Sequence, residues 1–242
     1  MGRLRIYLSP SKQPGNFYAS GNTNEQKEME EVAKTVKKIL DEEYDCESIL
    51  ATLTLGLGSE GRAKEAKEKA CDVYMAIHSN AGGNGKASGA VAFYHKAWKE
   101  SHILAEHLVR ELNGCCPHPT NRKMDIIDGM EAFEGKGYGE IRVPAMLGMI
   151  PVLAETNFHD NPVVAAWMIH SKATIARAYV EALVKAFNIN RKASEIIKIT
   201  GSTAEDKRFY RVQVGAFGKK ENAELMLKKL QDLGIDAYVR YS

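Results

Sequence analysis

Apolar and charged stretches alternate along the first 190 residues of this chain and predict strands separated by helices. Short apolar runs of the kind found in buried strands lie at 3–8, 46–53, 73–77, 87–94 and 150–154. Apolar residues recur at helical spacing from residue 25 onward and again at 59–70, 98–112 and 162–187. Strands that alternate with helices predict an α/β fold, with a mostly parallel twisted sheet and helices on both faces.

A second, smaller pattern occupies the end of the chain. A strand-like run at 209–215 precedes an amphipathic helix at 221–233, and a further strand is expected at 237–241. Such a small βαβ unit buries little apolar surface by itself. We therefore expect it to pair with a second copy of itself, or to use 196–199 as an extra strand.

These two patterns divide the chain into a large domain at 1–189, a polar linker at 190–207 and a small module at 208–242. The 242 residues suffice for one large domain and a small module. The segment 113–139, which holds two prolines and several glycines, is predicted to be irregular.

Charge and composition narrow the classes of function. The 33 Lys and Arg nearly balance the 31 Asp and Glu, so net charge does not indicate a nucleic-acid partner. No apolar run is long enough to span a membrane, and the basic start of the chain lacks the apolar core of a signal peptide. We expect a protein made in the cytoplasm without a secretion signal. Its four cysteines lack zinc-ribbon spacing and are expected to be reduced, with two of them in the core: Cys46, Cys71, Cys115 and Cys116.

Polar side chains stand where the predicted strands end. His78 ends the strand at 73–77, Glu155 and His159 follow the strand at 150–154, and Glu25 opens the first helix. In open α/β sheets, chemistry collects at the carboxyl ends of the strands. A simpler interpretation makes His78 a hydrogen-bonded strand-end residue and Glu25 a favourable charge at a helix start.

This set of residue types suits metal-assisted hydrolysis of an amide. Two imidazoles and one carboxylate are the usual ligands of a catalytic zinc, with a fourth position left for water. Zinc lowers the pKa of that water to about 7. A second carboxylate can then accept a proton and pass it to a leaving nitrogen.

Three segments together resemble a known family. AIHSNA at 76–81, the helix-opening Glu25, and PVLAE at 151–155 with the helix after it are similar to the zinc-dependent N-acetylmuramoyl-L-alanine amidases of type 3. The resemblance covers roughly residues 3–189. These enzymes cut the amide between the lactyl group of N-acetylmuramic acid and L-alanine in peptidoglycan. The resemblance implies that Glu25 and His78 bind Zn²⁺ and that Glu155 is the catalytic carboxylate.

The first loop departs from that family. Its usual first zinc ligand is a histidine in a DPGHGG-like loop, but the loop at 9–16 reads SPSKQPGN. The SPS-x-Q form resembles a subgroup in which FHDN follows the catalytic glutamate. We expect His159 to supply the missing imidazole. Alternatively, Gln13 or Asn16, or nothing, completes the site, and His159 only orders the turn at 158–162.

Other polar residues are candidates for contact with the substrate. Asn16, Asn80 and Arg142 are predicted to bind it, although Asn80 could instead cap the loop after His78. Glu140 and Arg142 lie in a GEIR segment, where a pairing role or a substrate contact is open and an ordinary surface ion pair is the simpler expectation. The remaining histidines show no ligand-like partner in the sequence: His95, His102, His107, His118 and His170.

The tail resembles the sporulation-related repeat known as SPOR. FYRVQVGAF at 209–217, followed by ENAE, carries this resemblance. It implies binding to peptidoglycan glycan chains, with Gln213 and Phe217 as the contact residues. A generic βαβ docking unit is the simpler alternative. A complete SPOR fold has two such halves and this chain has one, so a homodimer through the tail is expected.

The leading hypothesis is therefore a peptidoglycan amidase with a cell-wall-binding tail. It would act on the wall after release, either as a phage endolysin that passes a holin or as a mother-cell lytic enzyme of a spore-former. A second hypothesis is a catalytically inactive peptidoglycan-binding protein on an amidase fold. A more remote one is another zinc exopeptidase or a deacetylase on the same kind of sheet.

Overall fold

The computed structural model describes residues 3–192, 217–232 and 238–239. The chain forms two compact units, Met1–Ser194 and Glu195–Ser242. In the second unit, helix α8 spans Lys220–Asp232 and confirms the predicted tail helix. The rest of the predicted tail module lies outside the described residues, apart from three exposed side chains: Phe217, Tyr238 and Val239.

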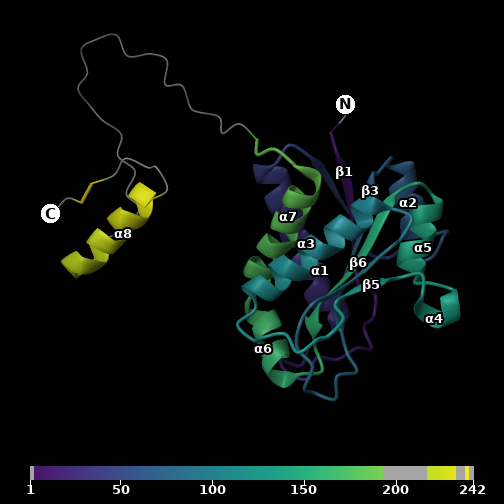
Figure 1. Ribbon diagram of the computed structural model, residues 1–242, viewed down its shortest axis with the longest axis horizontal. Coiled ribbons are helices and arrows are strands. Elements are labelled where there is room, and N and C mark those ends of the chain that lie inside the picture. Colours follow the sequence, from purple (N-terminus) through teal and green to yellow (C-terminus); the bar gives the residue numbers. More distant parts are fainter. Residues whose placement is uncertain (1–2, 193–216, 233–237, 240–242) are drawn as a thin grey trace, which may run out of the picture. The chain divides into compact units, whose positions relative to one another are not determined.

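A six-stranded sheet forms the centre of the first unit, in the order β2-β1-β3-β6-β4-β5 (Figure 1). Four of its strands run parallel: β1 (Arg5–Pro10), β2 (Glu47–Leu50), β3 (Val73–Asn80) and β6 (Ile150–Phe158). The other two run the opposite way: β4 (Val91–Tyr94), antiparallel to β6, and β5 (Ile126–Asp128), parallel to β4. The predicted α/β fold with a mostly parallel sheet is confirmed.

Helices cover both faces of this sheet (Figure 1). One apolar core joins the sheet to α1 (Glu25–Glu43), α3 (Lys99–Cys115), α6 (Pro162–His170) and α7 (Lys172–Phe187). A second core on the other face includes residues of α2 (Arg62–Glu68) and α5 (Gly139–Met146). Buried residues alternate between the two cores along β1, where Ile6 and Leu8 face one side and Tyr7 the other.

The sequence prediction was wrong in three places within this unit. The segment expected to be irregular holds β5 and the short α4 (Ala132–Gly135), and α5 follows it. The helix expected at 162–187 is two helices, because Ser171 has a non-helical backbone (φ −116°, ψ 23°). Strand β6 continues to Phe158, so Glu155 lies within the strand and not after it.

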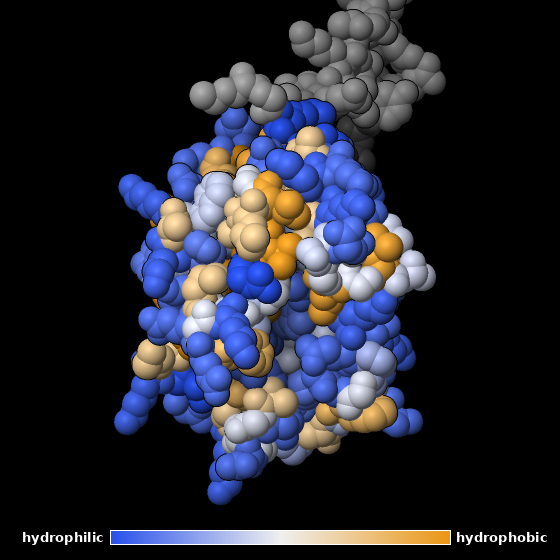
Figure 2. Space-filling view, turned by 90° about the vertical axis from the view of Figure 1, so that its right-hand side faces the viewer, coloured by the Kyte–Doolittle hydropathy of each residue, from blue (hydrophilic) through white to orange (hydrophobic). Residues whose placement is uncertain are grey.

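The face that carries α2, α4 and α5 is mainly hydrophilic, and its apolar residues gather mostly in the upper half of the view in Figure 2. Exposed apolar side chains of these helices include Met146 and Phe133. Among the described residues, no helix is both long and apolar enough to cross a membrane. The four cysteines are free, and Cys46 and Cys71 are buried, as predicted.

Glu65 anchors α2 to the sheet. It accepts hydrogen bonds from the Tyr7 hydroxyl, from the Thr52 amide at 3.0 Å and hydroxyl at 2.6 Å, and from Lys69 Nζ at 2.8 Å. Burial alone would raise the pKa of Glu65, but the bonds from Lys69, Thr52 and Tyr7 outweigh it and lower the pKa to about 2. The ionised carboxylate is therefore the form that the fold stabilises.

Replacement of this carboxylate makes stability depend less on pH. The folded pKa of Glu65 lies below the ordinary value, so its contribution is complete above about pH 4.5 and is lost as the pH falls towards 2. We expect Glu65→Gln to lower the free energy of unfolding by about 1–3 kcal/mol at pH 7. Urea unfolding of both proteins between pH 7 and pH 3 should show the difference shrinking with the pH. A difference that is the same at every pH would contradict this role.

Candidate active site

The sheet topology brings the predicted site residues to one edge. Strands β3 and β6 are neighbours, and their register places His78 opposite Glu155. Glu25 begins α1, whose N-cap Asn24 accepts a hydrogen bond from the Lys27 amide at 3.0 Å. All three residues thus lie together in the carboxyl-terminal half of these parallel strands.

His78 lies between two buried carboxylates. Its Nδ1 is 3.1 Å from Glu25 Oε1, and its Nε2 is 2.9 Å from Glu140 Oε2. Burial alone would lower the pKa of His78, but its hydrogen bonds to Glu140 and Glu25 outweigh it and raise that pKa well above its usual range. Burial likewise opposes ionisation of both carboxyls, yet the bonds to His78 hold their pKa values below the ordinary value. The three groups therefore stabilise one another's charges.

Glu140 was expected to form a surface ion pair, with a pairing role or a substrate contact as the alternatives. It is only 6% exposed, and its Oε1 is 2.7 Å from Ser9 Oγ and 2.9 Å from the Tyr74 hydroxyl. The expectation of a surface ion pair in the GEIR segment was therefore wrong. The segment is helix α5, whose buried residues are Glu140, Ile141 and Pro144. A proline inside a short helix hid the helical pattern that would have placed Glu140 on the inner side.

Two amides of the first loop also reach this cluster. Gln13 Nε2 lies 3.4 Å from His78 Nδ1. Asn16 Nδ2 donates to Glu25 Oε2 at 2.7 Å and to Gln13 Oε1 at 2.8 Å. The backbone amide of Ser79 completes the set with a 3.3 Å bond to Glu25 Oε1. The first loop thus supplies polar groups, but no imidazole, beside Glu25 and His78.

His159 takes a different position. Its Nδ1 is 2.9 Å from Ser79 Oγ, and its ring stacks on Tyr18 at a centroid distance of 5.1 Å. The Tyr18 hydroxyl donates to the same serine, and the Ala19 amide donates to the His159 carbonyl. Within 3–192, 217–232 and 238–239, no three His, Cys, Asp or Glu side chains form a group that could hold a metal. The structure does not join His159 to Glu25 and His78 in such a group.

Glu155 is the carboxylate opposite His78 in the sheet, and one of its oxygens is unpartnered among the described residues. Its Oε2 is buried and has no hydrogen-bond partner in the part of the chain that the structure describes. Burial raises the pKa of Glu155 to about 7, the charge of His78 opposes the rise, and Glu25 and Glu140 add to it. A carboxyl poised near neutral pH can both accept and return a proton.

The other predicted contact residues lie outside the buried cluster. Asn80 Oδ1 accepts from the Ala81 amide at 2.8 Å, which matches the capping alternative. Arg142 is exposed on α5, with Nη1 3.9 Å from Met146 Sδ. Gln213 lies outside the described residues, and Phe217 is 42% exposed.

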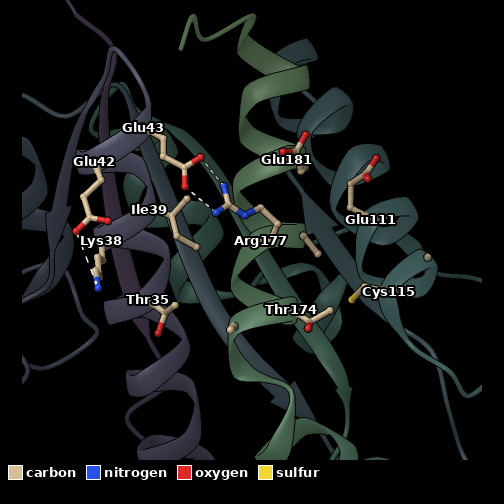
Figure 3. Close-up of a pocket in the computed structure, with 13 residues that line it drawn as sticks. Thr35, Lys38, Ile39, Glu42, Glu43, Glu111, Cys115, Thr174, Arg177 and Glu181 are labelled. Carbon is tan, nitrogen blue, oxygen red and sulfur yellow. Dashed lines mark hydrogen bonds and ion pairs between the residues drawn. The ribbon is translucent and has the colours of Figure 1, made fainter. Parts of the chain in front are cut away.

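A separate cavity of about 820 Å³ lies between α1, α3 and α7 (Figure 3). Arg177 and Glu43 form a two-bond ion pair across it, at 2.7 and 2.8 Å. Glu42, Glu111 and Glu181 add carboxylates to its lining. None of its lining residues belongs to the predicted site.

The sheet topology makes this an α/β protein. At the edge of its sheet an imidazole–carboxylate pair lies beside Glu155, whose buried Oε2 has no hydrogen-bond partner among the described residues, and this arrangement suits hydrolysis. The family model described as N-acetylmuramoyl-L-alanine amidase matches residues 10–185, and this chain belongs to that family. A second model, described as SPOR domain, matches residues 177–242, a range that takes in the predicted extra strand at 196–199.

Curated relatives match over nearly the whole chain. The N-acetylmuramoyl-L-alanine amidase CwlM of Bacillus licheniformis is 24% identical over 243 residues, which cover 98% of this chain and 85% of that protein. The sporulation-specific N-acetylmuramoyl-L-alanine amidase of Bacillus subtilis (strain 168) is also 24% identical, over 98% of this chain and 84% of that protein.

Solved structures share the fold of the first unit. The amidase AmiC2 of Nostoc punctiforme superposes with a TM-score of 0.63 at 18% identity, over 77% of this chain and 98% of that one. The catalytic domain of CwlV from Bacillus (Paenibacillus) polymyxa superposes with a TM-score of 0.59 at 17% identity, over 78% of this chain and 99% of that one. Both are similar in fold to this chain.

The contacts of His159 predict a structural role that can be measured. We expect His159→Phe to keep the stacking on Tyr18 and to lose the bond to Ser79, at a cost of about 1 kcal/mol in the free energy of unfolding. Urea unfolding compares this variant with wild type, and His170→Phe, at the exposed last residue of α6, serves as a control. Unchanged stability in His159→Phe would show that this bond does not anchor the first loop.

Proposed function

We propose that this chain hydrolyses the amide between N-acetylmuramic acid and L-alanine in peptidoglycan with a zinc-activated water. Membership of the amidase family supports the substrate class. The observation that carries the proposal is the buried Oε2 of Glu155, at the strand position opposite His78, which has no hydrogen-bond partner among the residues that the structure describes. This oxygen is available to the reacting water.

The donor set next to Glu155 fits a zinc ion in part. Glu25 Oε1 and His78 Nδ1 lie 3.1 Å apart, and a carboxylate and an imidazole are both common zinc ligands. Catalytic zinc usually has a third protein ligand, and His159 bonds to Ser79 instead. Gln13 faces His78 Nδ1 with its Nε2, and we propose it as the third ligand through its amide oxygen, which requires the amide group to turn over and give up its bond from Asn16.

Each residue then has a separate task. Bound zinc would supply a water that ionises at neutral pH. Glu25 and His78 hold the metal, and Asn16 fixes the carboxylate of Glu25 through its 2.7 Å bond. Glu155 accepts the proton of the attacking water and returns it to the nitrogen of the leaving L-alanine. A pKa near 7 suits both transfers.

The tail supports a lytic role on intact cell walls. A SPOR-type module that holds glycan strands keeps the hydrolase at a high local concentration on its polymer. We propose that Gln213 and Phe217 contribute to this binding and that the tail pairs between two copies of the chain. The Bacillus subtilis relative is named as sporulation-specific, which supports mother-cell lysis as the setting, with phage endolysin as the alternative.

Removal of the Glu155 carboxylate tests the proposed function. We expect Glu155→Gln to lower the release of free L-alanine amino groups from purified peptidoglycan by about 10²–10⁴-fold, because the proton acceptor is lost. Reducing sugar ends should not increase with either protein. Pelleting with peptidoglycan should be unchanged, which separates binding from hydrolysis.

Equal activity of Glu155→Gln and wild type would overturn the role of Glu155. A wild-type protein that pellets with peptidoglycan and releases no new ends would favour the second candidate, an inactive binding protein. The absence of a histidine from the SPSKQPGN loop is the observation that keeps this candidate open.

Zinc affinity distinguishes the proposed third ligand from His159. We expect Glu25→Gln to weaken zinc binding at least 100-fold, and Gln13→Ala to weaken it about tenfold, since each loses a ligand. His159→Phe should bind zinc as wild type does. Competition with a chromogenic chelator gives all three constants. A large loss in His159→Phe and none in Gln13→Ala would restore His159 as the ligand.

A further inference from the structure

We infer that Glu140 is a positioning residue, which holds His78 with a proton on Nε2 and so directs Nδ1 towards Glu25. Both carboxylate oxygens of Glu140 are occupied. Oε2 faces His78 Nε2 at 2.9 Å, and Oε1 lies within 2.9 Å of two hydroxyl groups. Glu140 is only 6% exposed and both of its oxygens are hydrogen-bonded, so these bonds fix its carboxylate in one orientation.

A buried arginine sets the direction of these hydrogen bonds. Arg62 is 1% exposed and donates from Nη1 to Ser9 Oγ at 3.2 Å and to the Pro10 carbonyl. Because Arg62 can only donate, Ser9 accepts from it and directs its own proton to Glu140 Oε1, 2.7 Å away. The positive charge one hydroxyl group away also compensates the buried carboxylate.

The consequence for His78 follows from the chemistry of imidazole. An ionised carboxylate accepts hydrogen bonds and cannot donate them, so Nε2 must carry the proton that faces Glu140. Nδ1 also faces a carboxylate, Glu25, so His78 without metal carries a proton on both nitrogens. Metal binding at Nδ1, the nitrogen that faces Glu25 and Gln13, would release only the Nδ1 proton, because Glu140 keeps the one on Nε2. Carboxylates that bond the outer nitrogen of a metal-binding histidine orient such ligands in many proteins. The effect on metal binding rests on the function proposed above. The position of the proton on His78 Nε2 follows from the geometry without that proposal.

This geometry predicts an unusual effect of an isosteric change. In Glu140→Gln, the Ser9 hydroxyl still donates a hydrogen bond, so the amide oxygen of the new glutamine takes the position that Oε1 of Glu140 has in wild type. The NH₂ group is then left facing His78 Nε2, which must accept the bond. His78 therefore loses the proton on Nε2 and keeps its only proton on Nδ1, where it bonds to Glu25 and occupies the nitrogen that a metal needs.

The test uses full-length protein and two readouts. Nitrogen-15 NMR of the histidine rings in the metal-free proteins should show a proton on Nε2 of His78 in wild type and none there in Glu140→Gln. Zinc dissociation constants, measured by chelator competition, should rise ten- to 100-fold in Glu140→Gln. Glu65→Gln makes the same change at a half-buried carboxylate outside the site, and its zinc dissociation constant should match that of wild type.

A rescue variant separates positioning from a merely structural role. With Ser9→Ala and Tyr74→Phe added to Glu140→Gln, no hydroxyl holds the amide oxygen, so the amide can turn and accept from Nε2. We expect this triple variant to bind zinc more tightly than Glu140→Gln alone. Should Glu140→Gln fail to fold, Ser9→Ala alone interrupts the link from Arg62, and a threefold or larger rise in the zinc dissociation constant is expected.

Two results would overturn the inference. One is a proton that stays on Nε2 of His78 in Glu140→Gln. The other is a zinc dissociation constant within threefold of the wild-type value in Glu140→Gln, in the triple variant and in Ser9→Ala. If wild type binds no zinc, the zinc part of the proposed function fails. The NMR comparison of the metal-free proteins then still decides the role of Glu140.

Discussion

The hydrogen bonds that hold His78 between Glu25 and Glu140 are the interaction on which the site depends. The three side chains come from α1, β3 and α5, and each is at most 6% exposed. A buried charge without a partner costs several kcal/mol, so none of the three is stable there alone. The docking of α1 and α5 against the sheet is thus coupled to the charge balance around one imidazole.

The same balance explains why Glu155 differs from the other two carboxylates. Glu25 and Glu140 each bond to His78 directly and stay ionised, whereas the described residues leave Glu155 Oε2 without a partner. Burial raises the pKa of all three carboxyls, and only the two that bond to His78 offset it, so similar side chains in one small volume acquire different proton affinities. Two of them are suited to binding a cation, and the third is suited to exchanging a proton.

Much of the fold could be predicted from the sequence, because its central strands are short, continuous apolar runs, a pattern that indicates buried strands. β1, β3 and β6 are of this kind, and α1 carries both a strong apolar stripe and a capping residue. The elements that were missed lack such signals. β5 has three residues, too few for a pattern, and α5 is a short helix interrupted by Pro144. The break at Ser171 occurs between two sequences that both favour a helix.

The candidate site could be predicted where a residue stands next to a recognisable element. Glu25 begins a helix, His78 lies near the end of a strand, and Glu155 lies opposite it. Glu140 could not be found, because its partners Ser9 and Tyr74 are distant in sequence and meet only in the folded sheet. The contacts of His159 with Tyr18 and Ser79 likewise depend on the path of the first loop.

The most direct test of the central claim is the release of free L-alanine amino groups from purified peptidoglycan by the metal-stripped protein before and after zinc is restored. We predict no release without metal and full release with zinc, with no increase in reducing sugar ends. Equal release in the presence of a strong chelator would contradict it, because the pair formed by Glu25 and His78 would then have no metal to hold.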